Sequence, residues 1–170
     1  MQVKEIIIDS SPLISLFLSH QSHLLAQLFT TVWVPDAVWE EVTTQEHNDL
    51  AYQGLTSASW IKRVSVNHIP DVINKRDLGR GETEVLSFAL NSESAHAMID
   101  DLAARRCAKA LGIATLGTGG MLVIAKQRGI IPSVGEALMA LRAAGMWVSD
   151  DLVQLLTSKA GETNPNQAHA

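Results

Sequence analysis

The segment Ala97–Arg106 has the sequence AMIDDLAARR, in which an apolar run ends in two carboxylates and continues into a helix-forming stretch. Ala97–Ile99 indicates the buried central strand of a sheet. In open α/β folds, ligands bind at the carboxyl ends of strands. Adjacent carboxylates repel each other unless protons, water or cations compensate their charge. We therefore expect Asp100 and Asp101 to belong to an acidic cluster that holds a divalent metal ion, although Asp101 alone could cap the following helix.

Length and composition are those of one globular domain. The chain has 170 residues, of which 46% are hydrophobic and 18% are charged, which allows a full core. We expect a single domain over residues 1–159 and a disordered tail over residues 160–170. Cys107 is the one cysteine in the sequence, so no internal disulfide can form. The sequence shows neither a secretory signal pattern nor an apolar run of membrane length, which favours the cytoplasm.

The formal net charge of −5 argues against a broad nucleic-acid-binding surface, since such surfaces are usually basic. It does not exclude a nuclease. If several acids surround a metal ion, the rest of the surface is closer to neutral, and local basic groups can bind a phosphate backbone. Arg105 follows the two aspartates and could reach a phosphate, although a solvated basic helix face is the simpler explanation.

Short apolar strands alternate with helices along the chain. Strands are expected at 5–9, 31–34, 61–66, 97–99 and 113–117, with the strand at 61–66 on an edge. Among the helices, bounds are expected near 21–29, 36–44, 48–59, 121–128, 134–144 and 149–158. The alternation predicts a parallel α/β domain, and the apolar first strand indicates burial on both faces.

Other acids are placed to join the two aspartates. Asp9 ends the first predicted strand, so Asp9 and Asp100 project from the same edge of a parallel sheet. Glu82 lies in the first turn of a helix, on its apolar face, where it either complements the helix dipole or faces the same cavity as Asp9. Glu84 is expected on the exposed surface of this helix.

The helix predicted at 36–44 adds a further candidate. Glu41 shares a face with Val38, which puts Glu41 on the inward edge if Val38 faces the core. The simpler interpretation is that Glu40 and Glu41 are both surface charges, because glutamate is a good helix former and is mostly exposed. Oxygen ligands alone suit magnesium or manganese rather than zinc. Metal ions held in this way can activate water and neutralise charge on a phosphodiester.

Several segments, taken in order, resemble the PIN-domain family in its toxin-like (VapC-like) branch in bacteria and archaea. The matching segments are 7–14 (IIDSSPLI), 34–42 (VPDAVWEEV), 78–84 (LGRGETE), 98–105 (MIDDLAAR), 117–120 (GTGG), 131–134 (IPSV) and 141–145 (LRAAG). Together they span most of residues 5–157. The resemblance implies a PIN-like three-layer α/β/α fold, with a central parallel sheet of about five strands flanked by helices.

The resemblance also implies Mg²⁺- or Mn²⁺-dependent endoribonuclease activity, usually as the toxin of a type II toxin–antitoxin pair. RNA is then the substrate, an antitoxin protein is the expected partner, and homodimers are common in the family. The implied catalytic acids are Asp9, Glu41, Glu82, Asp100 and Asp101. All of these except Glu41 are implied metal ligands. The resemblance further implies that Ser10, Arg105 and Thr118 orient water or phosphate.

Two other functions fit parts of the pattern. A catalytically silent PIN-fold protein that acts through protein partners would tolerate neutralisation of the acids. A phosphotransferase or phosphatase could use Asp9 as its nucleophile, but such enzymes usually need a second acid two residues later, where this chain has Ser11. RNA cleavage by the native chain and by Asp9→Asn distinguishes these functions from a nuclease.

Overall fold

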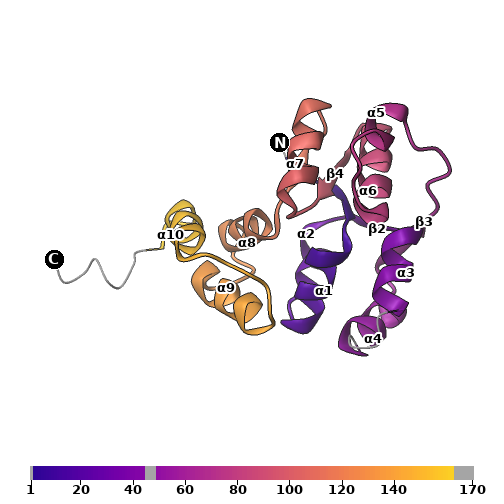
Figure 1. Cartoon of the computed structure of the whole chain (residues 1–170). Coiled ribbons are helices and arrows are strands. Elements are labelled where there is room, and N and C mark those ends of the chain that lie inside the picture. Colours follow the sequence, from indigo (N-terminus) through magenta and orange to yellow (C-terminus); the bar gives the residue numbers. More distant parts are fainter. Residues whose placement is uncertain (1, 45–48, 163–170) are drawn as a thin grey trace.

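The computed structural model describes residues 2–44 and 49–162. Five parallel strands form one sheet in the order β3-β2-β1-β4-β5 (Figure 1). The strands are β1 (Glu5–Ile8), β2 (Thr31–Pro35), β3 (Ile61–Val64), β4 (Ala95–Met98) and β5 (Thr115–Leu116). The parallel α/β architecture predicted from the sequence is therefore confirmed, and β3 is an edge strand as expected.

The middle of the sheet is β1, whose three isoleucines, Ile6–Ile8, are fully buried. This burial on both faces is typical of a strand covered by helices on each side. β1 pairs with β2 on one side and with β4 on the other. The prediction that residues 97–99 form the central strand is therefore wrong. β4 lies one place from the centre and begins two residues earlier, because Ala95 and His96 continue its pairing with β1.

Helices on both sides of the sheet give a three-layer α/β/α arrangement (Figure 1). On one side lie α5 (Asp71–Asn74), α6 (Arg80–Leu90) and α7 (Leu102–Ala110). On the other lie α1 (Ser10–Leu18), α3 (Asp36–Thr44) and α4 (Asp49–Ser57), and α2 (His23–Leu28) connects α1 to β2. Three further helices pack against one another beyond β5: α8 (Thr118–Gln127), α9 (Val134–Ala143) and α10 (Asp150–Lys159).

Two helices begin directly where strands end. α1 starts at Ser10 directly after Asp9, because Asp9 itself is the N-cap and accepts the Ser10 N–H at 2.9 Å. α8 starts at Thr118, three residues earlier than predicted, and its first N–H donates to Asp100 at 2.8 Å. Both first turns therefore lie at the carboxyl edge of the sheet, where they position side chains of the candidate site.

The described structure continues past residue 159, the predicted end of the domain. The Glu162 carboxylate accepts hydrogen bonds from the backbone N–H groups of Val134 and Gly135 at the start of α9. Residues 160–162 of the predicted tail therefore belong to the described structure, and residues 163–170 lie outside the described residues. None of the helices in residues 2–44 and 49–162 is long and apolar enough to cross a membrane.

Candidate active site

The carboxyl ends of three neighbouring strands meet at one edge of the sheet. The Asp9 N–H donates to the Met98 carbonyl at 3.1 Å, which extends the pairing of β1 with β4 by one residue. The Ile99 N–H donates in turn to the Leu116 carbonyl at 3.3 Å, which extends the pairing of β4 with β5. Asp9 and Asp100 therefore project from the same edge, as the sequence predicted.

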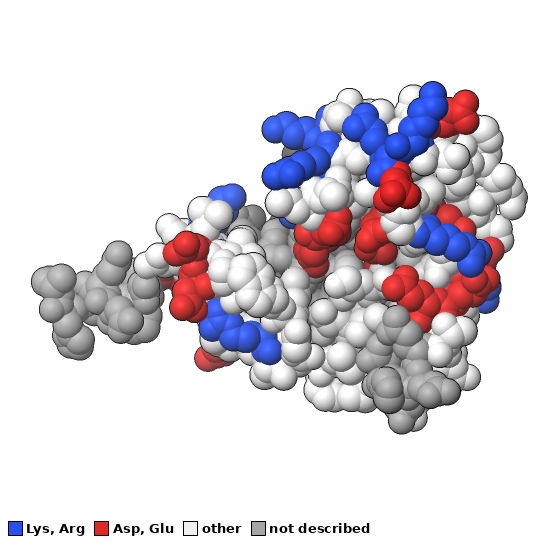
Figure 2. All heavy atoms as spheres, in the orientation of Figure 1, with Lys and Arg blue, Asp and Glu red and all other residues white. Residues whose placement is uncertain are grey.

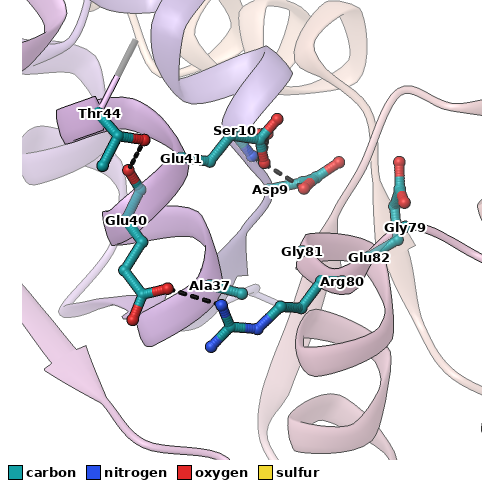
Figure 3. A pocket seen from close by; sticks show the side chains of 10 residues that line it. All are labelled: Asp9, Ser10, Ala37, Glu40, Glu41, Thr44, Gly79, Arg80, Gly81 and Glu82. Carbon is teal, nitrogen blue, oxygen red and sulfur yellow. Dashed lines mark hydrogen bonds and ion pairs between the residues drawn. The ribbon is translucent and has the colours of Figure 1, made fainter.

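A pocket of about 620 Å³ opens beside Asp9, between α3 and α6 (Figure 3). Ser10 links the carboxylates of Asp9 and Glu41. Its N–H donates to Asp9, and its Oγ donates to Glu41 at 2.9 Å. A Cβ atom built at Gly81 would lie 3.0 Å from Asp9 Oδ1 and 3.4 Å from Glu41 Oε2. Glycine at this position leaves room for both carboxylates. The lining residues are Asp9, Ser10, Ala37, Glu40, Glu41, Thr44, Gly79, Arg80, Gly81 and Glu82.

The two adjacent glutamates of α3 have different partners. Glu41 lies on the inward edge of its helix, and its exposed side chain reaches the site through the buried Ser10. Glu40 instead pairs with Arg80 at 2.6 Å across the pocket (Figure 3). Both glutamates are exposed, as the simpler interpretation of surface charges expects, but each has a partner on a neighbouring helix because α3 packs against α1 and α6 at this edge.

Asp100 and Asp101 also differ. Both oxygens of Asp100 are held by Thr118, which donates its N–H at 2.8 Å and its hydroxyl at 2.5 Å. Asp101 is exposed and is the N-cap of α7, where its carboxylate accepts the Ala104 N–H at 2.9 Å. The capping alternative thus describes Asp101, and Asp100 is the aspartate that shares the edge with Asp9.

Two residues expected to orient water or phosphate lie close to Asp100. Thr118 is fully buried, and its hydroxyl donates to Asp100, so it positions this carboxylate. Arg105, in contrast to Thr118, is exposed. A Cβ atom built at Gly117 would be 2.7 Å from Arg105 Nη1 and 3.3 Å from Asp100 Oδ1. The guanidinium therefore lies over Gly117, beside Asp100, and is open to a phosphate.

The two glutamates of α6 lie in different environments. Glu82 lines the pocket, and its carboxylate turns back over Gly79, where an added Cβ would be 2.4 Å from Glu82 Oε2. The prediction that Glu84 is exposed is wrong: its exposed fraction is 8%, and it accepts the Ala37 N–H at 2.8 Å. The first N–H groups of a helix lack partners within the helix, and Glu84 supplies one for the start of α3.

The acidic edge has an excess of negative charge. Burial, together with the neighbouring carboxylates Glu82, Glu41 and Asp100, raises the pKa of Asp9 to about 7, although the hydrogen bond from the Ser10 N–H lowers it. Figure 2 shows acidic side chains gathered in the centre of this face, with basic side chains on the surface above them, toward α7. A bound cation would relieve the repulsion between these carboxylates.

The side chains fit a metal ion by their chemistry. The set that surrounds Asp9 consists of carboxylates, which are the ligands that Mg²⁺ and Mn²⁺ prefer. In the part of the chain that the structure describes, no group of three or more His, Cys, Asp or Glu side chains is arranged to hold an ion as it stands. Glu82 lies against Gly79, and Asp100 is held by Thr118.

Comparison with known families identifies the domain. A family model described as a PIN domain matches residues 5–162. The chain belongs to the PIN-domain family. PIN domains are generally nucleases, and their usual cofactors are divalent metal ions. Neither the curated proteins nor the solved structures gave a match to the chain.

The PIN-domain match confirms the family and the three-layer fold expected from the sequence motifs. Sequence reasoning missed Arg80 and Glu40, which lie across the pocket from Asp9, and Gly81, which leaves room for its carboxylates. The sequence did contain a pattern that could have indicated Arg80 and Gly81. Arg80 and Gly81 stand between Gly79 and Glu82 at a helix start, where a short acidic motif with two glycines indicates close approach of backbone and side chains.

Proposed function

We propose that this PIN domain is a Mg²⁺- or Mn²⁺-dependent endoribonuclease. The observation that supports this most strongly is the position of Asp9, which is buried next to three further carboxylates. Burial and these negative charges together raise its pKa to about 7. In a member of a nuclease superfamily, such a site is suited to a divalent cation. Asp9, Glu82 and Asp100 are the proposed metal ligands, with Glu41 beside them.

When bound, such a cation supplies activation of water and neutralisation of the charge that develops on the phosphodiester. The chain's own residues position the reacting groups. Ser10 holds Glu41 next to Asp9, and Thr118 holds Asp100. Arg105 is open to a phosphate oxygen beside Asp100. We assign Asp101 to capping α7 and not to the metal.

We further propose that the protein is a VapC-like toxin of a type II toxin–antitoxin pair, acting on RNA in the cytoplasm. The family match and the order of the motifs support this assignment. The proposed antitoxin is a protein segment that covers the acidic pocket, and a homodimer is the proposed assembly. Co-expression tests the pairing: growth arrest by the native chain, absent in Asp9→Asn and relieved by a partner protein, is the expected result.

The activity is tested by incubating structured and single-stranded RNAs with the native protein in Mg²⁺, Mn²⁺ or EDTA. Asp9→Asn and Asp100→Asn are assayed alongside, and Asp101→Asn is the matched control. We expect cleavage that requires metal, is lost in the first two variants and persists in the control. If none of the RNAs is cut and calorimetry detects no Mn²⁺ binding, the catalytically silent PIN-fold alternative replaces this proposal.

A further inference from the structure

Arg80 occupies an unusual place in the acidic pocket. Among the described residues that line it, four carry carboxylates, and Arg80 is the one cationic side chain. Arg80 is the first residue of α6, two positions before Glu82, and its guanidinium reaches across to Glu40 on α3 (Figure 3). A phosphodiester that approached Asp9 through this pocket would meet Arg80 on its way in.

We propose that Arg80 is a substrate-binding residue whose guanidinium leaves Glu40 to bind a phosphate of the RNA strand, with Glu40 acting as its competitor. This inference rests on the proposed ribonuclease function and deepens it. It names a second basic contact, on the opposite side of the carboxylates from Arg105.

The two acidic partners of Arg80 hold different parts of its guanidinium. Glu40 Oε2 accepts from Nη1 at 2.6 Å, whereas Glu84 Oε1 lies 3.7 Å from Nε. Glu84 is buried and also accepts the Ala37 N–H, so it is fixed in place. Arg80 can therefore exchange its contact with Glu40 while Glu84 keeps the base of the guanidinium over the pocket.

The exchange is favourable because the contact with Glu40 is weak. The side chains of Arg80 and Glu40 are 66% and 49% exposed, and ion pairs exposed to this degree contribute little in water. A phosphate offers a guanidinium two parallel, charge-assisted hydrogen bonds. Glu40 places its carboxylate against the same guanidinium nitrogen, so Glu40→Gln should favour RNA binding.

The two arginines flank the acidic edge from opposite directions. Arg80 belongs to α6, on the side of the pocket that faces α3, and Arg105 belongs to α7, where it lies over Gly117 beside Asp100. A single strand laid across the carboxylates would therefore meet a guanidinium on each side of the phosphodiester to be cut. Arg80 and Arg105 thus supply, next to the carboxylates, the local positive charge that a protein of negative net charge needs to bind a phosphate backbone.

The test exploits the opposite signs expected for the two partners. Arg80→Gln and Glu40→Gln both break the ion pair, so a purely structural role predicts similar changes for both. We expect Arg80→Gln to raise the KM for cleavage of single-stranded RNA about tenfold, with kcat nearly unchanged. Glu40→Gln should lower KM by about threefold, and Arg80→Lys should restore part of the loss.

Lys4→Gln is the matched control, because Lys4 precedes β1 at the opposite edge of the sheet, and it should leave KM unchanged. Binding is measured separately by fluorescence anisotropy of a short labelled single-stranded RNA on proteins that also carry Asp9→Asn. There, Arg80→Gln should reduce the slope of log affinity against log salt by about 0.7. Thermal melts record the cost of breaking the pair itself.

The outcomes separate this inference from the proposed function. If the native protein cuts no RNA in Mg²⁺ or Mn²⁺, the ribonuclease proposal fails, and anisotropy alone decides the role of Arg80. If the native protein cuts RNA but Arg80→Gln and Glu40→Gln change KM in the same direction, or leave it unchanged, the assignment of Arg80 is overturned. Opposite changes in KM, or in affinity, support it.

Discussion

Asp9 has two roles that make opposite demands on its charge. As the N-cap of α1 it accepts a backbone N–H, which favours the carboxylate, but burial among other acids raises its pKa from 3.8 to about 7. Between these values the folded protein keeps a proton that the unfolded chain releases. The free energy of unfolding of the metal-free protein therefore has a contribution that falls as pH rises through this window and is fully lost above it.

Asp9→Asn tests this charge without removing the cap, because asparagine caps helices as well as aspartate does. Above the window we expect the variant to be more stable than the native metal-free protein by about 2–4 kcal/mol. Below it the two proteins should be equally stable, since Asp9 is then protonated in both folded and unfolded states. Urea unfolding in EDTA across this pH range measures the difference. A difference that does not change with pH would contradict the raised pKa.

The adjacent aspartates between β4 and α7 give a second prediction at the residue scale. Asp101 caps α7 and Asp100 faces the site, so their variants should separate stability from activity. Asp101→Ala should lose about 1 kcal/mol of unfolding free energy and keep its metal-dependent cleavage. Asp100→Asn should abolish cleavage while it remains folded by circular dichroism. Equal loss of cleavage in both variants would mean that the two carboxylates act together.

At the scale of elements, Glu84 fixes the start of α3 and with it the position of Glu41. Glu84→Ala leaves the Ala37 N–H without this acceptor, and we expect a loss of about 1–3 kcal/mol in unfolding free energy. Glu84→Gln keeps an acceptor oxygen and should lose less. Urea unfolding measures both variants, and their cleavage rates should fall in the same order. Equal stability of Glu84→Ala and the native protein would show that α3 is positioned by apolar packing alone.

The start of α9 is held by Glu162, which follows the end of α10 in the chain. Burial tends to raise the pKa of Glu162, but hydrogen bonds from Val134, Gly135 and Ser133, together with Lys126, lower it below 4.5 overall. Its contribution to stability is therefore present above pH 4.5 and is lost as pH falls through the lowered value. Glu162→Gln should cost about 1 kcal/mol at neutral pH. In acid its unfolding free energy should converge with that of the native protein, as measured by urea unfolding.

For the whole molecule, the order of strands and helices could be predicted because it depends on local patterns. The isoleucines of β1 predicted a buried strand, and the two strand-end acids, Asp9 and Asp100, predicted one shared edge. Positions that depend on contacts between distant segments were harder. The burial of Glu84 follows from the unpaired N–H groups of α3, some 47 residues away in the chain, and no spacing within α6 indicates that partner.

The same distinction explains which parts of the site the sequence could predict. The acids at the ends of β1 and β4 follow from strand endings, so Asp9 and Asp100 were recognised directly. Whether Glu41 reached the site depended on the helix register of α3, that is, on which face of the helix packs against α6 and α1. The position of Arg80 likewise depends on a contact between distant segments, because its partner Glu40 is 40 residues away in the chain.

The whole molecule should respond to metal, because the acidic edge destabilises the folded chain when no cation is present. A ligand that binds only the folded state stabilises it by about 2.7 kcal/mol at a hundred times its Kd. Mn²⁺ should therefore raise the Tm of the native protein, and EDTA should reverse the rise. Asp9→Asn should start from a higher Tm in EDTA and gain less from Mn²⁺, whereas Asp101→Asn should behave as the native protein does. If Mn²⁺ shifts the native protein and Asp9→Asn equally, the cation binds elsewhere, and Asp9 is not its ligand.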